Sequence, residues 1–220
     1  MRQLKVVNDR ILSIAGFSLL FAYLLSFLFE GQVLYCMLAY HDVHDSAYIL
    51  TAIVAHFAGL FSCGYLVKSP IGAKYTMLGS MLVCLIATTP FSFTPSVLWA
   101  AGLIISGYTG GCAVASWGYF LKAFTPKNQR IKSCADVLIY SNIIMIGVNV
   151  VAINGSPFIG LTLSMLCLVA GMVCIWVLPT DTKKAWCEET QSNPHGDIKK
   201  SLMLLCLFVF VITINSGLMY

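Results

Sequence analysis

Long apolar stretches separated by short polar turns form the dominant pattern along this chain. The clearest stretch covers residues 96–132, which follow the charge-free turn 92–95 and end in a basic segment. About 25 of these residues carry no charge, and at ~1.5 Å per residue they form a helix of ~38 Å, longer than a bilayer's hydrocarbon core of ~30 Å. The stretch therefore predicts a transmembrane helix.

The same pattern recurs along the rest of the chain. In addition to that stretch, it predicts helices over residues 11–39, 46–67, 75–90, 133–153 and 158–178. Residues 1–178 are thus predicted to form an all-α, polytopic membrane bundle of six transmembrane helices. Residues 179–200 read as a cytoplasmic linker, and residues 201–220 as a seventh apolar segment just long enough to span a bilayer. Because no polar tail follows that segment, we interpret it as the start of a second half outside this chain.

Composition narrows the class of protein. Of the 220 residues, 59% are hydrophobic and 10% are charged, whereas soluble domains average about 25% charged residues. The mean hydropathy is +0.85. The alternating segments of a strand-built membrane barrel are not seen, so the composition indicates a helical integral membrane protein. The nine cysteines include no C-x-x-C pair, and we interpret them as small buried residues in a reduced setting.

The basic residues alternate with the predicted spans. All 13 Lys and Arg lie in four segments, at residues 2–10, 68–74, 122–132 and 183–200. The turns after the first, third and fifth predicted helices contain none. Because cytoplasmic loops carry an excess of Lys and Arg, this distribution predicts a multi-pass cell-membrane protein with a cytoplasmic N-terminus, and we take the bacterial plasma membrane as its location. We expect these charges to contact anionic lipid rather than nucleic acid, because they are not interleaved with aromatic residues.

Small residues recur on one face of the stretch at residues 96–132. Gly107, Gly111 and Ala115 are spaced four residues apart, so they lie on one side of a helix. In lipid, such a stripe lets a neighbouring helix approach closely. The spacing therefore predicts a tight helix–helix contact at this face.

Two polar loops resemble those of a known transporter family. Residues 64–74, Gly-Tyr-Leu-Val-Lys-Ser-Pro-Ile-Gly-Ala-Lys, are similar to a degenerate form of the loop G-x-L-a-D-r-x-G-r-r that joins helices 2 and 3 in the major facilitator superfamily. Residues 120–130 are similar to the family's aromatic-Pro-x-x-x-Arg exit from helix 4. With the layout of six spans, a linker and a seventh span, the chain resembles the N-terminal half of such a protein. The resemblance implies transport of a small solute by alternating access, with a second six-helix half as partner.

The chain also departs from the family pattern. Lys68 stands where the loop's acid is expected, and one residue too many separates Gly64 from Gly72. Residues 104–107 contain no Arg, and helix 5 lacks the Gly-Pro pair of the drug–proton antiporters. These departures favour an alternative of another class, in which the chain is a non-transporting membrane sensor region resembling that of bacterial LuxR-type transcriptional regulators.

Polar residues within the apolar stretches are the candidate ligand contacts, because burying them in lipid is costly. In facilitator folds helices 1, 2, 4, 5 and 7 contribute to the central cavity, so the resemblance implies a substrate-binding set. Its members are Tyr23, Glu30, His56, Tyr108, Asn142, Asn149 and Asn215. Two interpretations stay open for most of them: His56, Asn142 and Asn149 either bond a neighbouring helix or line the cavity, and Glu30 lies either at the outer boundary or in the cavity.

Catalytic and metal-binding motifs are not evident. The sequence contains no H-E-x-x-H, G-x-S-x-G or phosphate-binding glycine loop, so we predict no enzyme activity, no cofactor and no metal. The turn at residues 40–45 holds two His and two Asp; it is either a solvated turn or a weak divalent-cation site. Asp136 is predicted near the start of its helix, where it would satisfy free amides.

Overall fold

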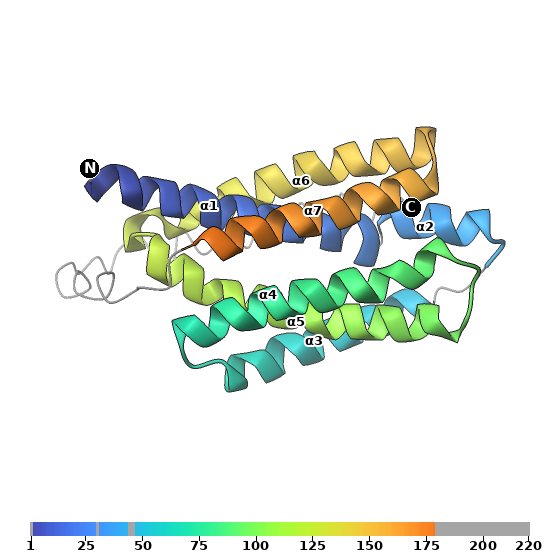
Figure 1. Cartoon of the computed structure of the whole chain (residues 1–220), viewed down its shortest axis with the longest axis horizontal. Helices are drawn as coiled ribbons and strands as arrows, with labels where there is room; N and C mark the ends of the chain where they lie inside the picture. Colours follow the sequence, from blue (N-terminus) through green and yellow to red (C-terminus); the bar gives the residue numbers. More distant parts are fainter. Residues whose placement is uncertain (1, 30, 44–46, 179–220) are drawn as a thin grey trace. The chain divides into compact units, whose positions relative to one another are not determined.

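The computed structural model describes residues 2–29, 31–43 and 47–178 (Figure 1). Every regular element in this part of the chain is a helix. The elements are α1 (Arg2–Tyr23), the π-helical η1 (Leu24–Leu28), α2 (Gln32–Tyr40), α3 (Ala47–Leu66), α4 (Pro70–Thr88), the 3-10 helix η2 (Thr89–Ser92), α5 (Val97–Phe124), the 3-10 helix η3 (Lys127–Gln129), α6 (Arg130–Asn154) and α7 (Pro157–Val177). The all-α prediction is confirmed for these residues; the predicted linker and seventh segment lie outside them.

Five helical stretches in the described part of the chain are long and apolar enough to cross a membrane. They are Asp9–Tyr40, Pro70–Ser92, Val97–Phe124, Lys127–Asn154 and Pro157–Val177, and Leu50–Tyr65 is a shorter apolar helix. In order, these match the six helices predicted from the sequence. Their length and composition are compatible with a protein embedded in a membrane.

Large apolar side chains face outward from the helices. On α3, an exposed stripe at helical spacing consists of Leu50, Val54, Phe57, Phe61 and Tyr65, each between 56% and 86% exposed. Small polar residues lie inside instead: Ser106, Ser116, Ser133, Ser141 and Ser164 are fully buried. Because an apolar exterior costs free energy in water and none in lipid, this arrangement suits a bilayer.

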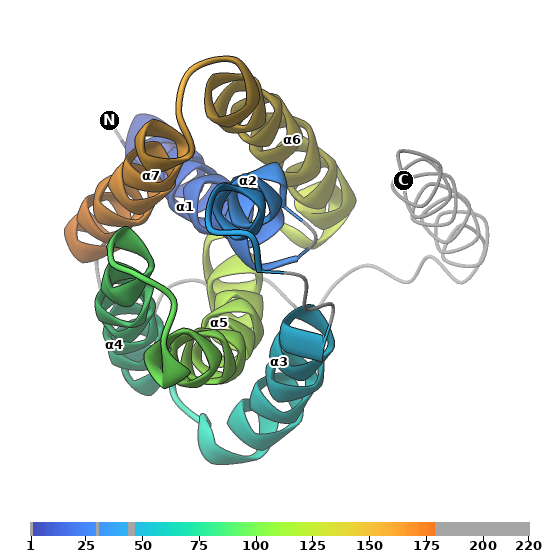
Figure 2. The same cartoon turned by 90° about the vertical axis from the view of Figure 1, so that its right-hand side faces the viewer.

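The helices pack in two corresponding groups of neighbours. Seen end-on, the first span (α1 with α2) lies between α6 and α7, and α5 lies between α3 and α4 (Figure 2). The packing of the first span against α6 and α7 therefore corresponds to the packing of α5, the fourth span, against α3 and α4, the second and third spans. In addition, α1 packs on α5 and α4 packs on α7. The correspondence is incomplete, because α6 packs on α7 whereas α3 and α4 scarcely touch.

The closest helix contact is between α3 and α5, and glycine makes it possible. A Cβ added to Gly107 would lie 2.5 Å from the Ala52 carbonyl oxygen, and one added to Gly111 would lie 2.2 Å from that of His56. From the other side, a Cβ on Gly59 would lie 2.0 Å from the Tyr108 carbonyl oxygen. The predicted tight contact at the Gly107–Gly111 stripe is confirmed, and its partner is α3.

The first predicted helix differs from the observed one. The sequence predicts one continuous helix over residues 11–39, but helical structure starts at Arg2, passes into a π-helix after Tyr23 and is interrupted before α2. The residue that permits the interruption is Gly31, which is extended (φ −74°, ψ 138°). A Cβ there would lie 1.8 Å from the Ser26 carbonyl oxygen. Only glycine, which has no Cβ, therefore allows the backbone to approach so closely.

The turn predicted at residues 68–74 is also shorter than expected. Ser69 is the N-cap of α4, and its Oγ accepts a hydrogen bond of 3.1 Å from the Gly72 backbone N–H. Pro70 is the first helical residue, where its fixed φ and missing N–H are compatible with a helix. The sequence predicts a connection that lasts until residue 74, and α4 instead begins at Pro70. Lys74 consequently lies within the helix and is buried.

The basic segments in the described part of the chain gather at one end of the bundle. The start of α1, the α3–α4 connection and the α5–α6 connection lie at the same end, and the α4–α5 and α6–α7 connections lie at the opposite end (Figure 1). This is the separation of charge that the alternation of basic turns predicts.

Candidate functional site

The interruption of the first span lies near the middle of the apolar stretch Asp9–Tyr40. In η1 the Phe29 N–H donates to the Leu24 carbonyl oxygen at 2.7 Å, a π-type hydrogen bond. Phe29 then turns to an extended conformation (φ −107°, ψ 92°). The end of a helix leaves its last carbonyls without helical partners, and the start of the next leaves its first N–H groups free. Such groups are costly within a membrane unless other partners satisfy them, and interrupted helices are therefore frequent at ligand sites.

His56 of α3 lies beside this interruption. Its side chain is only 8% exposed, and its ring packs edge-on against Phe29 with a centroid distance of 4.6 Å. Its Nδ1 is buried and has no hydrogen-bond partner. A buried polar atom without a partner is uncommon in folded proteins and marks a site that requires an explanation.

Gly110 of α5 lies next to that nitrogen. A Cβ added there would lie 3.6 Å from His56 Nδ1 and 2.9 Å from Cδ2 of Leu24. Gly110 therefore differs in role from Gly107 and Gly111, which face backbone atoms of α3. A side chain at Gly110 would contact both the imidazole and the leucines of η1. We define the interruption site as Leu24, Leu28, Phe29, His56 and Gly110.

Tyr108, also predicted as a ligand contact, lies on the same α3–α5 interface. Its hydroxyl is 2.9 Å from the Ser62 Oγ, and the residue is 39% exposed. Deeper in this interface the Cys63 Sγ donates to the Cys112 carbonyl oxygen at 3.3 Å. The structure thus places His56 and Tyr108 on one helix pair, with Tyr108 at its open edge.

Tyr23 is sealed inside the bundle. It is 0% exposed, and its hydroxyl is 2.7 Å from the Thr88 Oγ1 of α4. Thr88 in turn donates to the Cys84 carbonyl oxygen at 2.7 Å, so in the Tyr23–Thr88 pair the tyrosine is the donor. The arrangement satisfies the tyrosine hydroxyl by a helix–helix hydrogen bond.

Replacing Tyr23 by phenylalanine is expected to lower the free energy of unfolding by about 0.5–1.5 kcal/mol, the usual net contribution of one hydrogen bond. The loss is small because Thr88 keeps its bond to Cys84. Thermal unfolding of the purified protein would measure it. A matched Tyr75→Phe variant, at an exposed position of α4, should change nothing; equal losses at both positions would contradict the assignment.

The two predicted asparagines lie on α6. The Asn142 Nδ2 donates to the Leu138 carbonyl oxygen of its own helix at 2.7 Å. The Asn149 Oδ1 is buried and has no hydrogen-bond partner. In the described part of the chain neither side chain hydrogen-bonds a residue of the interruption site. The remaining two predicted residues, Glu30 and Asn215, lie outside the described residues.

An aromatic cluster that the sequence did not reveal lies at the end of α2, where the first span finishes. The His41 ring lies 5.0 Å from Tyr40, 5.4 Å from Trp99 and 6.4 Å from Phe158, centroid to centroid. These rings come from α2, α5 and α7. His41 was predicted in a solvated turn or a weak cation site; it packs among aromatic rings instead, and Asp42 follows in a left-handed conformation (φ 53°).

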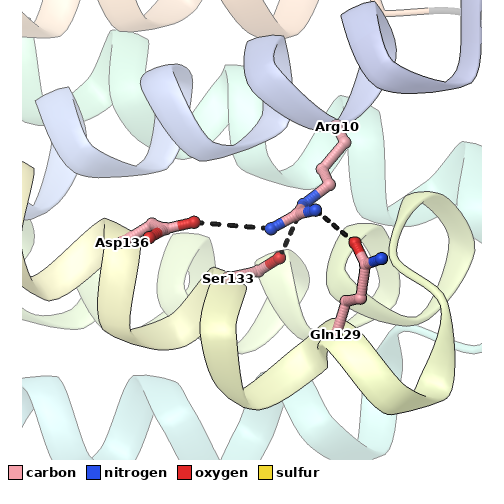
Figure 3. A network of polar contacts seen from close by, with 4 residues as sticks. All are labelled: Arg10, Gln129, Ser133 and Asp136. Atoms are coloured by element: carbon pink, nitrogen blue, oxygen red, sulfur yellow. Dashed lines mark hydrogen bonds and ion pairs between the residues drawn. The ribbon is translucent and has the colours of Figure 1, made fainter.

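Arg10 links α1 to the start of α6 (Figure 3). Its Nε donates to the Ser133 Oγ at 3.0 Å, its Nη2 lies 3.4 Å from the Asp136 Oδ2, and its Nη1 donates to the Gln129 side-chain oxygen. Because α6 begins at Arg130, Asp136 lies in the second turn rather than at the helix start. The predicted role of Asp136 as a cap of free amides is therefore wrong, and its partner is Arg10.

Replacing Arg10 by alanine is expected to lower the free energy of unfolding by about 1–3 kcal/mol, because Ser133 is buried and Asp136 would lose its ion pair. Lys132→Ala, which removes an exposed cation of the same end, is the control and should stay within about 0.5 kcal/mol. Chemical unfolding of both variants measures the difference. If the two variants lose the same amount, the network makes no specific contribution.

Neither a metal site nor a similar protein assigns a function to this chain. The described residues contain no group of three or more His, Cys, Asp or Glu able to hold a metal ion. Comparison with protein-family models, curated proteins and solved structures finds no match for this chain. The candidate site therefore depends on its own geometry, and the strongest feature of that geometry is the interruption site with the unpartnered nitrogen of His56.

Proposed function

We propose that the chain is part of a facilitator-type secondary transporter that moves a small solute across the cell membrane by alternating access. The observation that carries the proposal is the interruption of the first span near its middle, beside a buried histidine with a free nitrogen. In many secondary transporters the solute binds near the bilayer midplane, where discontinuous helices expose backbone groups. His56 and the Gly107–Gly111 segment are also near the middle of their own helices.

The arrangement of neighbours supports the same proposal. Facilitator halves are built from two three-helix repeats of inverted topology. Two such repeats make the first span correspond to the fourth, and the fifth and sixth spans correspond to the second and third. The neighbours of the described helices follow this correspondence. A fold is weak evidence for a function by itself, so the interruption site carries the greater weight.

The proposal includes an orientation and a partner. Six spans start from a cytoplasmic N-terminus, which places the basic end of the bundle in the cytoplasm in agreement with the positive-inside tendency. We take residues 179–200 as a cytoplasmic linker and residues 201–220 as a seventh span, as the sequence predicts. A second six-helix half closes the solute cavity, with Tyr108 at the open edge of α3–α5 facing it.

Thiol accessibility tests alternating access without knowledge of the solute. Tyr108→Cys is introduced into the full-length gene product with its native cysteines replaced, and a charged, membrane-impermeant maleimide is applied from either side of sealed vesicles. We expect labelling from both sides, because a cavity position opens to each in turn. Phe57→Cys, on the exposed apolar stripe of α3, is the control and should resist labelling from both sides. Labelling of Tyr108→Cys from one side alone, or from neither side, would contradict the proposed function.

A further inference from the structure

We propose that three free lysines at the basic end of the bundle, Lys68, Lys127 and Lys132, bind the headgroups of anionic phospholipids. The basic end is the one that holds the start of α1, the α3–α4 connection and the α5–α6 connection (Figure 1). The sequence predicts lipid contact for the basic segments as a group, whereas the structure separates the cations that the protein itself binds from those that it leaves free. Lipid binding of this kind goes beyond the proposed function, because it does not require transport.

Three other cations of this end are bound within the protein. Arg10 pairs with Asp136 of α6 at 3.4 Å. Lys74 donates to the Trp176 carbonyl oxygen at 2.8 Å and is only 9% exposed. Arg130 donates to two backbone carbonyl oxygens of its own connection, each at 3.3 Å. These side chains therefore hold helices and a connection in place.

Lys68, Lys127 and Lys132 differ from these cations. Their side chains are exposed, and no described residue accepts a hydrogen bond from them or forms an ion pair with them. The carboxylate of Asp136 is already paired with Arg10. Residues 179–200 contain four acidic and four basic residues, so they bring no net negative charge. The three lysines are thus open to an external anion.

The three lysines lie where the headgroups of a bilayer would be. Lys68 precedes the apolar helical stretch Pro70–Ser92, and Lys127 and Lys132 lie in the first two turns of the stretch Lys127–Asn154. A lysine near the end of a membrane span lays its alkyl stem along apolar surface and extends its ammonium group to the interface. At that level it meets the phosphate groups of the lipids.

Apolar and aromatic side chains beside the lysines favour a phospholipid over a soluble anion. Ile131, next to Lys132 in sequence, is 53% exposed, and Tyr65, three residues before Lys68, is 86% exposed. Tyrosine rings prefer the membrane interface, and an exposed isoleucine is compatible with acyl chains. A soluble phosphate would gain nothing from these side chains. An anionic lipid uses both features, and each lysine near the headgroups raises its affinity about fivefold.

Native mass spectrometry of the full-length protein tests the proposal. The protein is titrated in a neutral detergent with dioleoylphosphatidylglycerol or dioleoylphosphatidylcholine, which share their acyl chains and differ in net charge. We expect the first phosphatidylglycerol molecules to bind about fivefold or more tightly than phosphatidylcholine. Added salt should weaken the binding of phosphatidylglycerol only. Equal affinity for the two lipids would overturn the proposal.

Single substitutions identify the cations that bind the lipid. Lys68→Gln, Lys127→Gln and Lys132→Gln should each weaken phosphatidylglycerol binding about fivefold and leave phosphatidylcholine binding unchanged. All three positions are exposed, so the variants should fold. Lys74→Met is the control, because it removes the same charge from the same end but its ammonium group is bound to carbonyl oxygens of residues 176 and 178.

The control separates free lysines from overall charge. Lys74→Met should change phosphatidylglycerol affinity less than about twofold, because a charge that does not reach the headgroup acts only through screened attraction. Equal losses in this variant and in the three lysine variants would mean that net charge attracts the lipid, and would contradict the proposal. The comparison of the two lipids on the unmodified protein stays decisive even if Lys74→Met does not fold.

A competition experiment distinguishes a lipid headgroup from a soluble phosphate. Glycerol 3-phosphate carries the phosphate group without acyl chains, and in large excess it should leave bound phosphatidylglycerol in place. Displacement by glycerol 3-phosphate would identify a soluble-anion surface and sink the lipid assignment. One-sided labelling of Tyr108→Cys, in contrast, would contradict transport and leave the lipid surface intact.

Discussion

Gly111→Ala is expected to lower the free energy of unfolding by about 1–3 kcal/mol, the usual cost of overpacking a helix contact. The added Cβ would lie 2.2 Å from the His56 carbonyl oxygen and 2.8 Å from the Leu60 backbone nitrogen. Both are backbone atoms of α3, so neither can move aside by a change of rotamer. The substitution must therefore move α3 away from α5. In lipid this costs stability, because helices associate through close van der Waals packing and not through the hydrophobic effect.

The same substitution elsewhere on α5 provides the control for Gly111. Gly118→Ala adds the same methyl group where no atom lies within 4 Å, and alanine favours a helix over glycine by up to about 1 kcal/mol. The control should therefore be neutral or slightly stabilising. Reversible unfolding in mixed micelles measures both variants. Similar losses at the two positions would mean that the α3–α5 contact is looser than the structure indicates.

Lys74→Met is expected to lower the free energy of unfolding by about 1–3 kcal/mol. The Lys74 Nζ donates to the Trp176 carbonyl oxygen at 2.8 Å and to that of Leu178, so a side chain at the start of α4 holds the last carbonyls of α7. Methionine keeps the apolar stem and removes the donor, which leaves the carbonyl of the buried Leu178 without this partner. The positive charge beside the C-terminal end of α7 is lost as well.

An exposed lysine from the same connection is the control for Lys74. Lys68→Met removes a charge at an exposed position and should change stability by no more than about 0.5 kcal/mol. A structural readout accompanies the stability measurement: amide exchange at the end of α7 should accelerate in Lys74→Met and stay unchanged in Lys68→Met. Protected amides at the end of α7 in both variants would contradict the assigned contact.

Both stability predictions concern residues whose partners are remote in sequence. Gly111 meets His56 across 55 positions, and Lys74 meets Trp176 across 102. The sequence analysis foresaw that the Gly107–Gly111 stripe would pack closely against a helix, but not which helix. It placed Lys74 in a polar turn, because a lysine near Pro70 and Gly72 resembles a solvated connection when its acceptors are unknown.

The candidate site was foreseen in part. His56 was predicted because an ionisable side chain within an apolar stretch is costly and needs a reason. Its free Nδ1 and the role of Gly110 were not, since both depend on how α3 meets α5 and η1. The interruption of the first span was missed for a related reason. Residues 11–39 contain no proline and are mostly apolar, and the short polar run Glu30-Gly31-Gln32 is a weak signal by itself.

The order of apolar helices and basic turns was determined by the sequence alone, because transfer into lipid depends on the local run of side chains and not on distant partners. The tertiary structure decided which helices touch, where the first span is interrupted and which polar atoms are left without partners. The helix contacts and the unpartnered atoms follow from contacts between residues tens to more than a hundred positions apart, which no local pattern contains. The interruption joins near neighbours in sequence, Ser26 and Gly31, but a lone glycine does not specify it.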